Sequence, residues 1–302
     1  MYHETRTPAT ELRTNVNRYC IIKYNNGTTI REINPSTNIW VYFNITNQSS
    51  YKLIEVSNKI EMPKTITDFI EMSKRDTISM GNTIMGPHRT MGIEVTQGET
   101  TIIGIEFKTG INKSFFGHSI EKIANTIIPV DESFVFLQKL RNVICGTPRN
   151  EVFNIIDNFL IDNMSINPYS IITDNKLYKI LENIEGNPFN KTADNMANLY
   201  STSLRNFNRI MKSYVGLSPQ QFIMTQKINK LTQIMIDNPQ ESIITIVSKC
   251  GYEDLTHLNR DFRLLGGLSA SQVIDNIRQR LEFMPSPLGY NNLGEVDCIN
   301  LL

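Results

Sequence analysis

The spacing of hydrophobic residues changes near Pro129, and this change constrains the fold more than any other feature of the chain. Before Pro129, short apolar runs alternate with turn residues such as Asn and Gly, as in YCIIKY, NIWVYFNI and TTIIGIEF. Such runs of Ile, Val, Tyr and Phe are typical of β-strands. After Pro129, apolar residues recur at every third and fourth position, which is typical of amphipathic helices. The chain therefore combines a β-rich first part with a helical second part.

The first part, from about Tyr19 to Lys108, shows no long helical pattern between its predicted strands. Short strands at this spacing favour a barrel or a sandwich. The stretch EMPKTITDFIEMSKRDTI fits either a turn of helix or another pair of strands. Trp40, Tyr42 and Phe43 are compatible with a ligand pocket, although NIWVYFNI is explained more simply as a buried strand.

Two amphipathic helices are predicted directly after Pro129. Residues 132–144 carry an apolar stripe, and Pro148 is placed to begin a second helix with a stripe of its own. The two stripes consist of Phe136, Leu137, Leu140, Val143 and Ile144, and of Val152, Ile155, Ile156, Phe159 and Leu160. These helices pack either on their own domain, which is the simpler alternative, or on a second copy of the chain.

An Asn-, Ser- and Pro-rich stretch at 162–175 separates the two parts, and the residues after it are helical in pattern almost throughout. The predicted fold class is α+β with more than one domain. A β-rich, sensory or dimerisation domain is expected at 1–165, with its helices beginning at about 132. A linker follows at 166–172, then an all-helical domain at 173–284 and a carboxyl-terminal tail at 285–302.

The composition excludes several classes of protein. The 30 Lys and Arg side chains balance 30 Asp and Glu side chains, so whole-chain charge does not identify a partner. The scattered cysteines form neither a zinc-binding pattern nor a disulfide framework, which favours a reducing compartment and no bound metal. A polar amino terminus and the lack of long apolar runs favour a cytoplasmic protein without a membrane span. No catalytic motif stands out, so we expect no enzyme and no cofactor.

Residues 204–214 combine a buried face with an exposed polar face. On a helix, Phe207, Ile210, Met211 and Tyr214 point inward together. Arg205, Asn208 and Arg209 lie on another face, and Arg and Asn are the side chains that match guanine and adenine edges in the major groove. The preceding segment NMANLY supplies a short packing helix. This arrangement predicts a helix-turn-helix.

The same arrangement recurs in IVSKCGYEDLTHLNRDF. Thr256, Asn259 and Arg260 repeat the polar spacing, and Arg260 follows Arg209 by 51 residues. A helix at 219–236, of about 18 residues and roughly 27 Å, lies between the two units. It would hold two recognition helices about 34 Å apart, which is one turn of duplex DNA. The predicted partner is therefore double-stranded DNA.

This pair of motifs resembles the DNA-binding domain of the AraC/XylS family of bacterial transcription regulators. The resemblance covers about 173–280, including the GLSP after the first recognition helix and the GY that opens the second unit. It departs from the family at Ser201, Val247, Val273 and the GLSA at 267–270. The resemblance places the base-facing positions on Arg205, Asn206, Asn208 and Arg209, and on Leu255, Thr256, Asn259 and Arg260. Leu255 can make only an apolar contact, so the second unit is expected to read fewer bases.

The family resemblance also implies a function and partners. It implies an activator more than a repressor, acting with RNA polymerase. Lys212, Lys227 and Lys230 are the candidate contacts to DNA phosphates.

The first domain carries a second resemblance. Residues 84–131, with Gly86-Pro87, Gly104 to Phe107 and Pro129-Val130-Asp131, are similar to the amino-terminal domain of a subset of AraC-type regulators. This similarity implies a cupin-like barrel or sandwich that senses a small-molecule effector or holds a homodimer. A regulator without an effector, controlled by its abundance or by a protein partner, is the alternative. A fusion to a DNA-repair alkyl acceptor is disfavoured, because the zinc-binding cysteines and the nucleophile site are missing.

Overall fold

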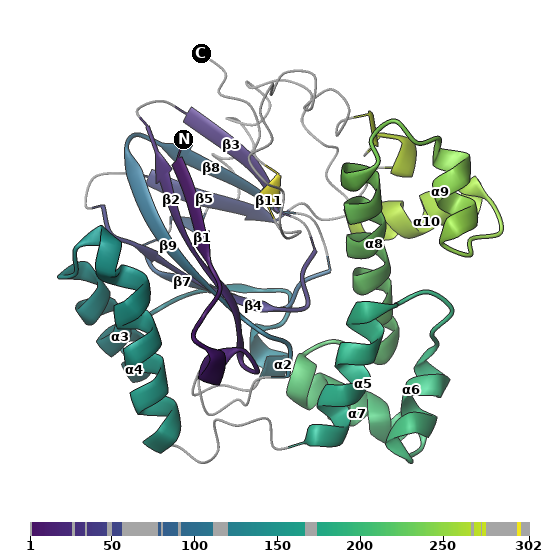
Figure 1. Ribbon diagram of the computed structural model, residues 1–302, viewed down its shortest axis with the longest axis horizontal. Coiled ribbons are helices and arrows are strands. Elements are labelled where there is room, and N and C mark those ends of the chain that lie inside the picture. The colour runs from purple at the N-terminus through teal and green to yellow at the C-terminus, as the bar shows by residue number, and fades with distance from the viewer. Residues whose placement is uncertain are drawn as a thin grey trace.

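The computed structural model of the chain describes two regions, one built on strands and one built on helices (Figure 1). The described residues are 2–25, 28–33, 35–46, 50–55, 78–79, 81–89, 92–110, 120–166, 174–266, 269–272, 274–275 and 295–296. The predicted α+β fold class is confirmed, with antiparallel sheets first and a helical domain after them.

The first sheet has six strands in the order β1-β2-β9-β4-β7-β10, each antiparallel to its neighbours. Its strands are β1 (Tyr2–Arg6), β2 (Val16–Tyr24), β4 (Ile39–Asn44), β7 (Thr83–Met85), β9 (Thr100–Phe107) and β10 (Ile127–Pro129). Strands β2, β4 and β9 are buried on both faces, which explains why their sequences are apolar runs rather than alternating patterns. Trp40, Tyr42 and Phe43 are all buried in β4, as expected for a buried strand.

The second sheet has five strands in the order β11-β3-β8-β5-β6. Its strands are β3 (Thr28–Ile33), β5 (Ser50–Glu55), β6 (Ile78–Ser79), β8 (Gly92–Gln97) and β11 (Glu295–Val296). Most of the ambiguous stretch at 61–78 lies outside the described residues. Of the predicted tail only β11 is described, and it pairs with Glu32 and Ile33 of β3.

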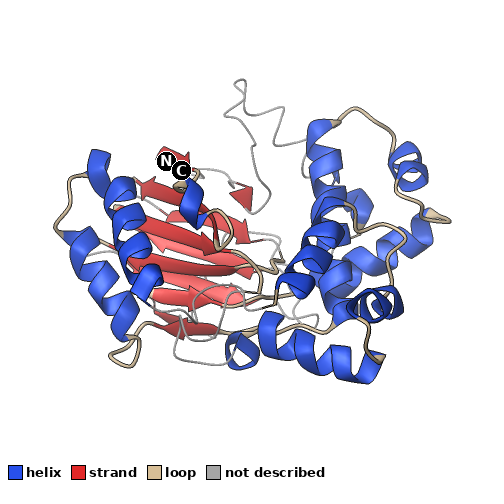
Figure 2. Cartoon of the chain, turned by 60° about the horizontal axis from the view of Figure 1, so that its bottom comes forward, coloured by secondary structure: helices blue, strands red, loops and turns tan. Residues whose placement is uncertain are grey.

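Helices α3 (Val135–Cys145) and α4 (Val152–Ile166) cover one face of the first sheet, as Figure 2 shows. The short 3-10 helix η3 (Arg149–Glu151) lies between them, and another, η1 (Thr10–Leu12), precedes β2. Leu137, Leu140 and Ile156 join Tyr19 and Ile21 of the sheet in a single core. Of the two alternatives left open by the sequence, these helices therefore pack on their own domain.

The opposite face of the same sheet carries a buried polar cluster beside aromatic side chains. Arg18 Nε donates to Glu106 Oε2 at 2.7 Å, and both side chains are almost completely buried. The Arg18 guanidinium lies 5.0 Å from the ring centroid of Trp40, which stacks on Tyr42. Gly104 makes room here, because a Cβ at this position would lie 2.5 Å from Cys20 Sγ.

The helical domain contains α5 (Asn175–Gly186), α6 (Ala193–Tyr200), α7 (Leu204–Val215), α8 (Pro219–Asp237), α9 (Ile243–Lys249) and α10 (Leu255–Gly266). Side chains of Thr192, Ser203, Ser218 and Ser242 accept hydrogen bonds from the first turns of four of these helices. Helix α8 contributes Phe222 to one core and Leu231 to another, so it joins two packed units. Towards the end of the all-helical domain predicted at 173–284, residues 270–272 and 274–275 are described and are helical.

Within the described residues, no helix combines the length and hydropathy needed to cross a membrane.

Candidate nucleic-acid interface

The first helix-turn-helix unit consists of α6 and α7. Ser201 ends α6 in the left-handed conformation with φ of 65°, at the position where the sequence departs from glycine. The next residue, Thr202, donates its backbone N–H to the Ala197 oxygen at 3.0 Å, which closes the turn. The Ser203 hydroxyl then caps α7. These local bonds fix the direction in which α7 leaves the turn.

Helix α7 is strongly amphipathic. Phe207, Met211 and Val215 are buried in the core shared with α5, α6 and the start of α8. Ile210 and Tyr214, which the sequence places on the inward face, are partly buried against the same core. The predicted base-reading residues all lie on the remaining surface: Arg205 and Arg209 are exposed, and Asn206 and Asn208 are half-buried.

The two asparagines of α7 make local hydrogen bonds. Asn208 Nδ2 donates to the Leu204 oxygen at 2.9 Å, which uses one of its amide hydrogens. Asn206 Nδ2 donates to Thr202 Oγ1 at 2.8 Å, and Asn206 Oδ1 accepts from a terminal nitrogen of Arg209 at 3.0 Å. The structure therefore joins Asn206 and Arg209 as a hydrogen-bonded pair, a contact that their i, i+3 spacing allows but does not specify.

The second unit, α9 and α10, repeats this architecture. Gly251 takes the left-handed conformation with φ of 71°, and the Tyr252 N–H donates to the Val247 oxygen at 3.1 Å. Cys250 is buried beside the turn, and burial raises the pKa of its thiol, as expected for a core cysteine. The Tyr252 hydroxyl donates to Asp261 at 3.1 Å, and burial raises the pKa of Tyr252.

The predicted base readers of α10 are less uniformly placed than those of α7. Thr256 and Arg260 are exposed. Asn259 is half-buried and its Oδ1 accepts from the Ala270 N–H at 2.9 Å, so one of the two groups needed to recognise adenine is engaged inside the domain. Leu255 packs partly against the core.

The electrostatic surroundings of the two recognition helices also differ. Helix α7 contains no acidic residue, whereas Glu253 and Asp254 precede α10 and Asp261 lies within it. The His257 N–H donates to Asp254 and lowers the pKa of that carboxyl. Arg260 Nε lies 3.9 Å from Asp261 Oδ1. An anionic ligand is therefore repelled more at α10 than at α7.

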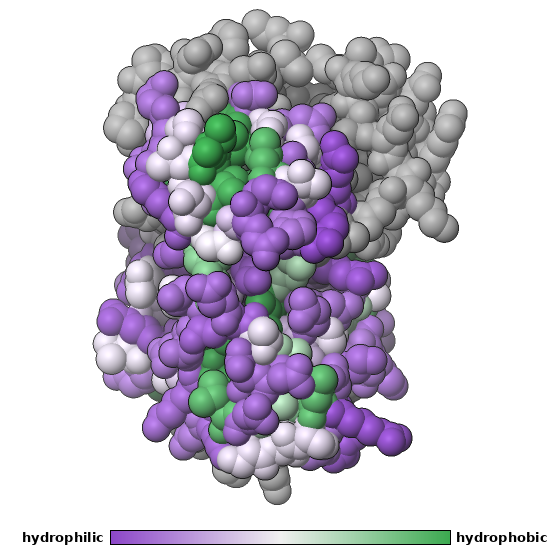
Figure 3. Space-filling view, turned by 90° about the vertical axis from the view of Figure 1, so that its right-hand side faces the viewer, coloured by the Kyte–Doolittle hydropathy of each residue, from purple (hydrophilic) through white to green (hydrophobic). Residues whose placement is uncertain are grey.

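Of the three candidate phosphate contacts, one lies on α7 and two lie on α8. Lys212 is exposed in the last turn of α7, Lys230 is exposed on α8, and Lys227 on α8 is half-buried. Figure 3 shows that the face of the helical domain turned away from the sheets is mainly hydrophilic, with small apolar patches. Among the residues of this domain whose side chains are described, the exposed large apolar ones are Leu199, Leu204 and Ile244.

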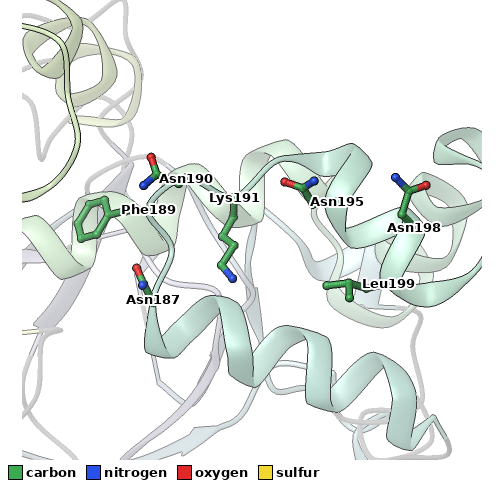
Figure 4. A pocket seen from close by; sticks show the side chains of 7 residues that line it. All are labelled: Asn187, Phe189, Asn190, Lys191, Asn195, Asn198 and Leu199. Carbon is green, nitrogen blue, oxygen red and sulfur yellow. The ribbon is translucent and has the colours of Figure 1, made fainter.

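An open pocket of about 640 Å³ lies beside the first unit, and sequence reasoning did not point to it. Figure 4 shows its lining, which comes from the loop after α5 and from the outer side of α6. The lining residues are Asn187, Phe189, Asn190, Lys191, Asn195, Asn198 and Leu199. Their amide groups form a polar surface, and the only charged side chain among them, Lys191, donates to Asn183 at 2.9 Å.

The described parts of the two domains contact each other around α2 (Ile120–Ile123), which packs against α7. Gly216 follows α7 with φ of 79°. A Cβ at this position would lie 2.8 Å from the Ala124 Cβ and 3.0 Å from the Ile120 oxygen, so this close approach requires glycine.

A second contact between the domains is polar. Gln226 Nε2 of α8 donates to Thr37 Oγ1 at 2.8 Å. The Thr37 carbonyl accepts from Thr109 Oγ1, the Thr109 N–H donates to Asn38 Oδ1, and Asn38 Nδ2 donates to Glu106 Oε1 at 2.8 Å. A hydrogen-bonded path therefore runs from the buried ion pair of the first sheet to α8, the helix between the two recognition units.

The described residues contain no cluster of three or more His, Cys, Asp or Glu side chains arranged to hold a metal ion.

Comparisons with known proteins match both regions of the chain. Residues 196–276 match a family described as a helix-turn-helix domain, and residues 4–129 match a domain of unknown function (DUF6597). A stretch of 70 residues is 30% identical to the HTH-type transcriptional activator RhaS of Enterobacter sp. (strain 638). This match covers 23% of the chain and only 25% of the length of that relative.

Two solved structures that match much of the chain do so with low TM-scores. ToxT from Vibrio cholerae O395 has a TM-score of 0.43 and 11% identity, and the match covers 91% of this chain and 98% of ToxT. The AraC-like transcriptional activator CuxR has a TM-score of 0.27 and 9% identity, with coverage of 76% and 86%.

Proposed function

We propose that this chain, whose carboxyl-terminal domain resembles those of the AraC/XylS family, is a regulator of transcription that binds a specific DNA sequence. The observation that carries this proposal is that the guanidinium groups of Arg205 and Arg209 are exposed on α7, while the opposite face of α7 packs into the core of the first helix-turn-helix unit. In it, α7 and α10 enter successive major grooves of one duplex. Selection of bound duplexes from a random pool, followed by footprinting, tests it: a wild-type protein that enriches no sequence contradicts it.

The two recognition helices have unequal roles in this proposal. Arg205, Asn208 and Arg209 read bases from α7, and Thr256 and Arg260 read bases from α10. Leu255 contributes an apolar contact, and Asn259 contributes through its amide nitrogen because its oxygen is engaged by Ala270. Lys212, Lys227 and Lys230 contact phosphates, which adds affinity without sequence preference. The acidic residues around α10 support a weaker reading by the second unit.

We expect Arg209→Ala to weaken specific binding by about 1–3 kcal/mol, mainly through loss of preference at one base pair. Titrations of the selected duplex and of its single-base variants measure this change. Arg209→Lys keeps the charge but removes the planar fork, so it should lose most of the base preference while retaining binding to unrelated DNA. An equal loss on every sequence would show that Arg209 contacts only the backbone.

The proposal further assigns activation of transcription, through contact with RNA polymerase, to the DNA-bound protein. It is supported by the family resemblance and by the activator among its relatives. Transcription from a promoter that contains the selected sequence, with purified polymerase, tests this assignment: the protein should increase the number of transcripts, and a decrease would indicate a repressor.

We also propose that the amino-terminal domain controls DNA binding through its contacts with α7 and α8. The Gln226–Thr37 hydrogen bond joins that domain to the helix that spaces the two recognition units. If a small-molecule effector shifts the first sheet, the hydrogen bonds from Glu106 to Gln226 would transmit that shift to α8. In the alternative, abundance or a protein partner controls the regulator, and no small molecule raises the melting temperature of the full chain by mass action.

The contact itself gives a prediction. Gln226→Ala removes a hydrogen bond of about 0.5–1.5 kcal/mol, so amide hydrogen exchange in α2 and along α8 should become about 2–10-fold faster. The affinity for the selected duplex should change as well. Gln220→Ala is the matched control, because Gln220 lies exposed on the same helix. Exchange and affinity that match those of the control would contradict control through this contact.

A further inference from the structure

A chain of side chains leads from the turn of the first unit to its recognition surface. Thr202 is held in the turn by its backbone bond to Ala197. Its hydroxyl oxygen accepts from Asn206 Nδ2 at 2.8 Å, and Asn206 Oδ1 accepts from Arg209 at 3.0 Å. Thr202 and Asn206 are half-buried, whereas Arg209 is exposed. The exposed guanidinium is thus tied, through two shorter side chains, to the backbone of the turn.

The amide of Asn206 is engaged at both of its ends. Recognition of adenine by an asparagine requires its oxygen and its nitrogen together, one for each group on the base edge. For Asn206, these groups already bond Arg209 and Thr202. Direct base reading would compete with these two bonds for the same amide group, whereas keeping them restrains a long side chain.

Restraint of Arg209 favours one kind of contact. Guanine presents two acceptors, O6 and N7, to a guanidinium that approaches with two parallel N–H groups. An arginine has many rotamers in solution, and fixing it on binding opposes the gain from these bonds. A guanidinium held in place by Asn206 before DNA arrives loses less freedom and discriminates more strongly between guanine and other bases.

We propose that Asn206 reads no base itself but positions the guanidinium of Arg209, with Thr202 as its anchor. Asn206 and Arg209 together then set the guanine preference of the first unit. This inference rests on the proposed function and refines the role that the family resemblance gives to Asn206. Asn206 is then a positioning residue, and Arg209 is the residue that touches the base.

The second unit is built differently at the corresponding positions. Its residue equivalent to Asn206 is His257, whose Nδ1 lies 3.3 Å from Glu253 Oε2. Its residue equivalent to Arg209 is Arg260, which approaches the acidic Asp261. Base preference should therefore be sharper under α7 than under α10.

Selection of duplexes from a random pool with the full-length wild type, Arg209→Ala and Asn206→Ala tests the inference. Arg209→Ala should reduce the preference at one base pair by about 5–150-fold. Asn206→Ala should reduce the preference at that same base pair by about 2–10-fold, as expected for loss of one hydrogen bond. In the Arg209→Ala background, Asn206→Ala should change binding by less than about 2-fold, because its only route to the base is gone.

Thr202 supplies the variants that separate positioning from folding. Thr202→Val keeps the shape but removes the hydroxyl, so it should reproduce the loss seen with Asn206→Ala at that base pair. Thr202→Ser retains the hydroxyl and should restore the wild-type preference. Thermal unfolding of each variant confirms that the domain is intact, and Thr202→Val replaces Asn206→Ala if that variant does not fold.

The outcomes distinguish this inference from the proposal beneath it. A wild-type protein that enriches no sequence overturns both. Sequence-specific binding in which Asn206→Ala acts at a different base pair, or in which its effect multiplies with that of Arg209→Ala, overturns the inference alone and makes Asn206 a base reader.

Discussion

Glu106→Ala is expected to lower the free energy of unfolding of the amino-terminal domain by about 3–5 kcal/mol, because it leaves the Arg18 guanidinium buried without its carboxylate. The Glu106 side chain is only 5% exposed. It accepts hydrogen bonds from Arg18, Asn17 and Asn38, at 2.7, 2.8 and 2.8 Å. Trp40 is the single tryptophan of the chain and lies 5.0 Å from the Arg18 guanidinium, so its fluorescence in a denaturant titration follows this domain directly.

Glu99→Ala is the matched control for this prediction. Glu99 precedes β9 and forms an ion pair with Lys23 at 2.8 Å, but its side chain is 54% exposed. Solvent screens such pairs, so the control should lose no more than about 1 kcal/mol. Equal losses for the two variants would show that burial of the Arg18–Glu106 pair has no energetic consequence.

Phe207→Ala should destabilise the helical domain by about 3–5 kcal/mol, since it empties the centre of its first core. Phe207 is 0% exposed and its ring lies 5.4 Å from that of Tyr200. Unfolding followed by far-ultraviolet circular dichroism should show an early loss of helix, while Trp40 fluorescence still reports a folded first sheet. Specific DNA binding should fail at temperatures where this early transition is complete.

Leu204→Ala provides the comparison on the same helix. Leu204 is also apolar, but it is 37% exposed at the beginning of α7. Its removal should change stability by less than about 1 kcal/mol, within the usual range for surface substitutions. A loss as large as that of Phe207→Ala would mean that the apolar stripe of α7 is not what holds the helix in place.

The sequence predicts most of the helical domain because its signals are local. Ser203 and Ser218 cap the helices that follow them, and Gly216 takes the left-handed conformation that ends α7. The three-and-four spacing of Phe207 and Met211 identifies the buried face correctly. The apolar runs likewise locate strands such as β9 (Thr100–Phe107), since their β-branched residues fill a sheet buried on both faces.

Local sequence patterns do not predict features that depend on partners far away in the chain. β1 is a strand because it pairs with β2, although its largely exposed residues YHETR show no strand pattern. Arg18 and Glu106 are 88 residues apart, and nothing local to either indicates burial. The family resemblance places Asn206 among the base-facing residues, whereas its hydrogen bonds to Thr202 and Arg209 depend on side-chain geometry that neither the resemblance nor the spacing specifies.

The polar path from Glu106 to Gln226 has a reciprocal consequence. If an effector on the first sheet changes the affinity of the helical domain for its operator by some factor, thermodynamic linkage requires the operator to change the affinity for the effector by the same factor. Protein bound to its operator would then have a different affinity for the small molecule from that of free protein. Each copy of the operator in the cell would thus adjust the sensitivity of the regulator bound to it, so the dose response of a target gene would depend on its own binding site.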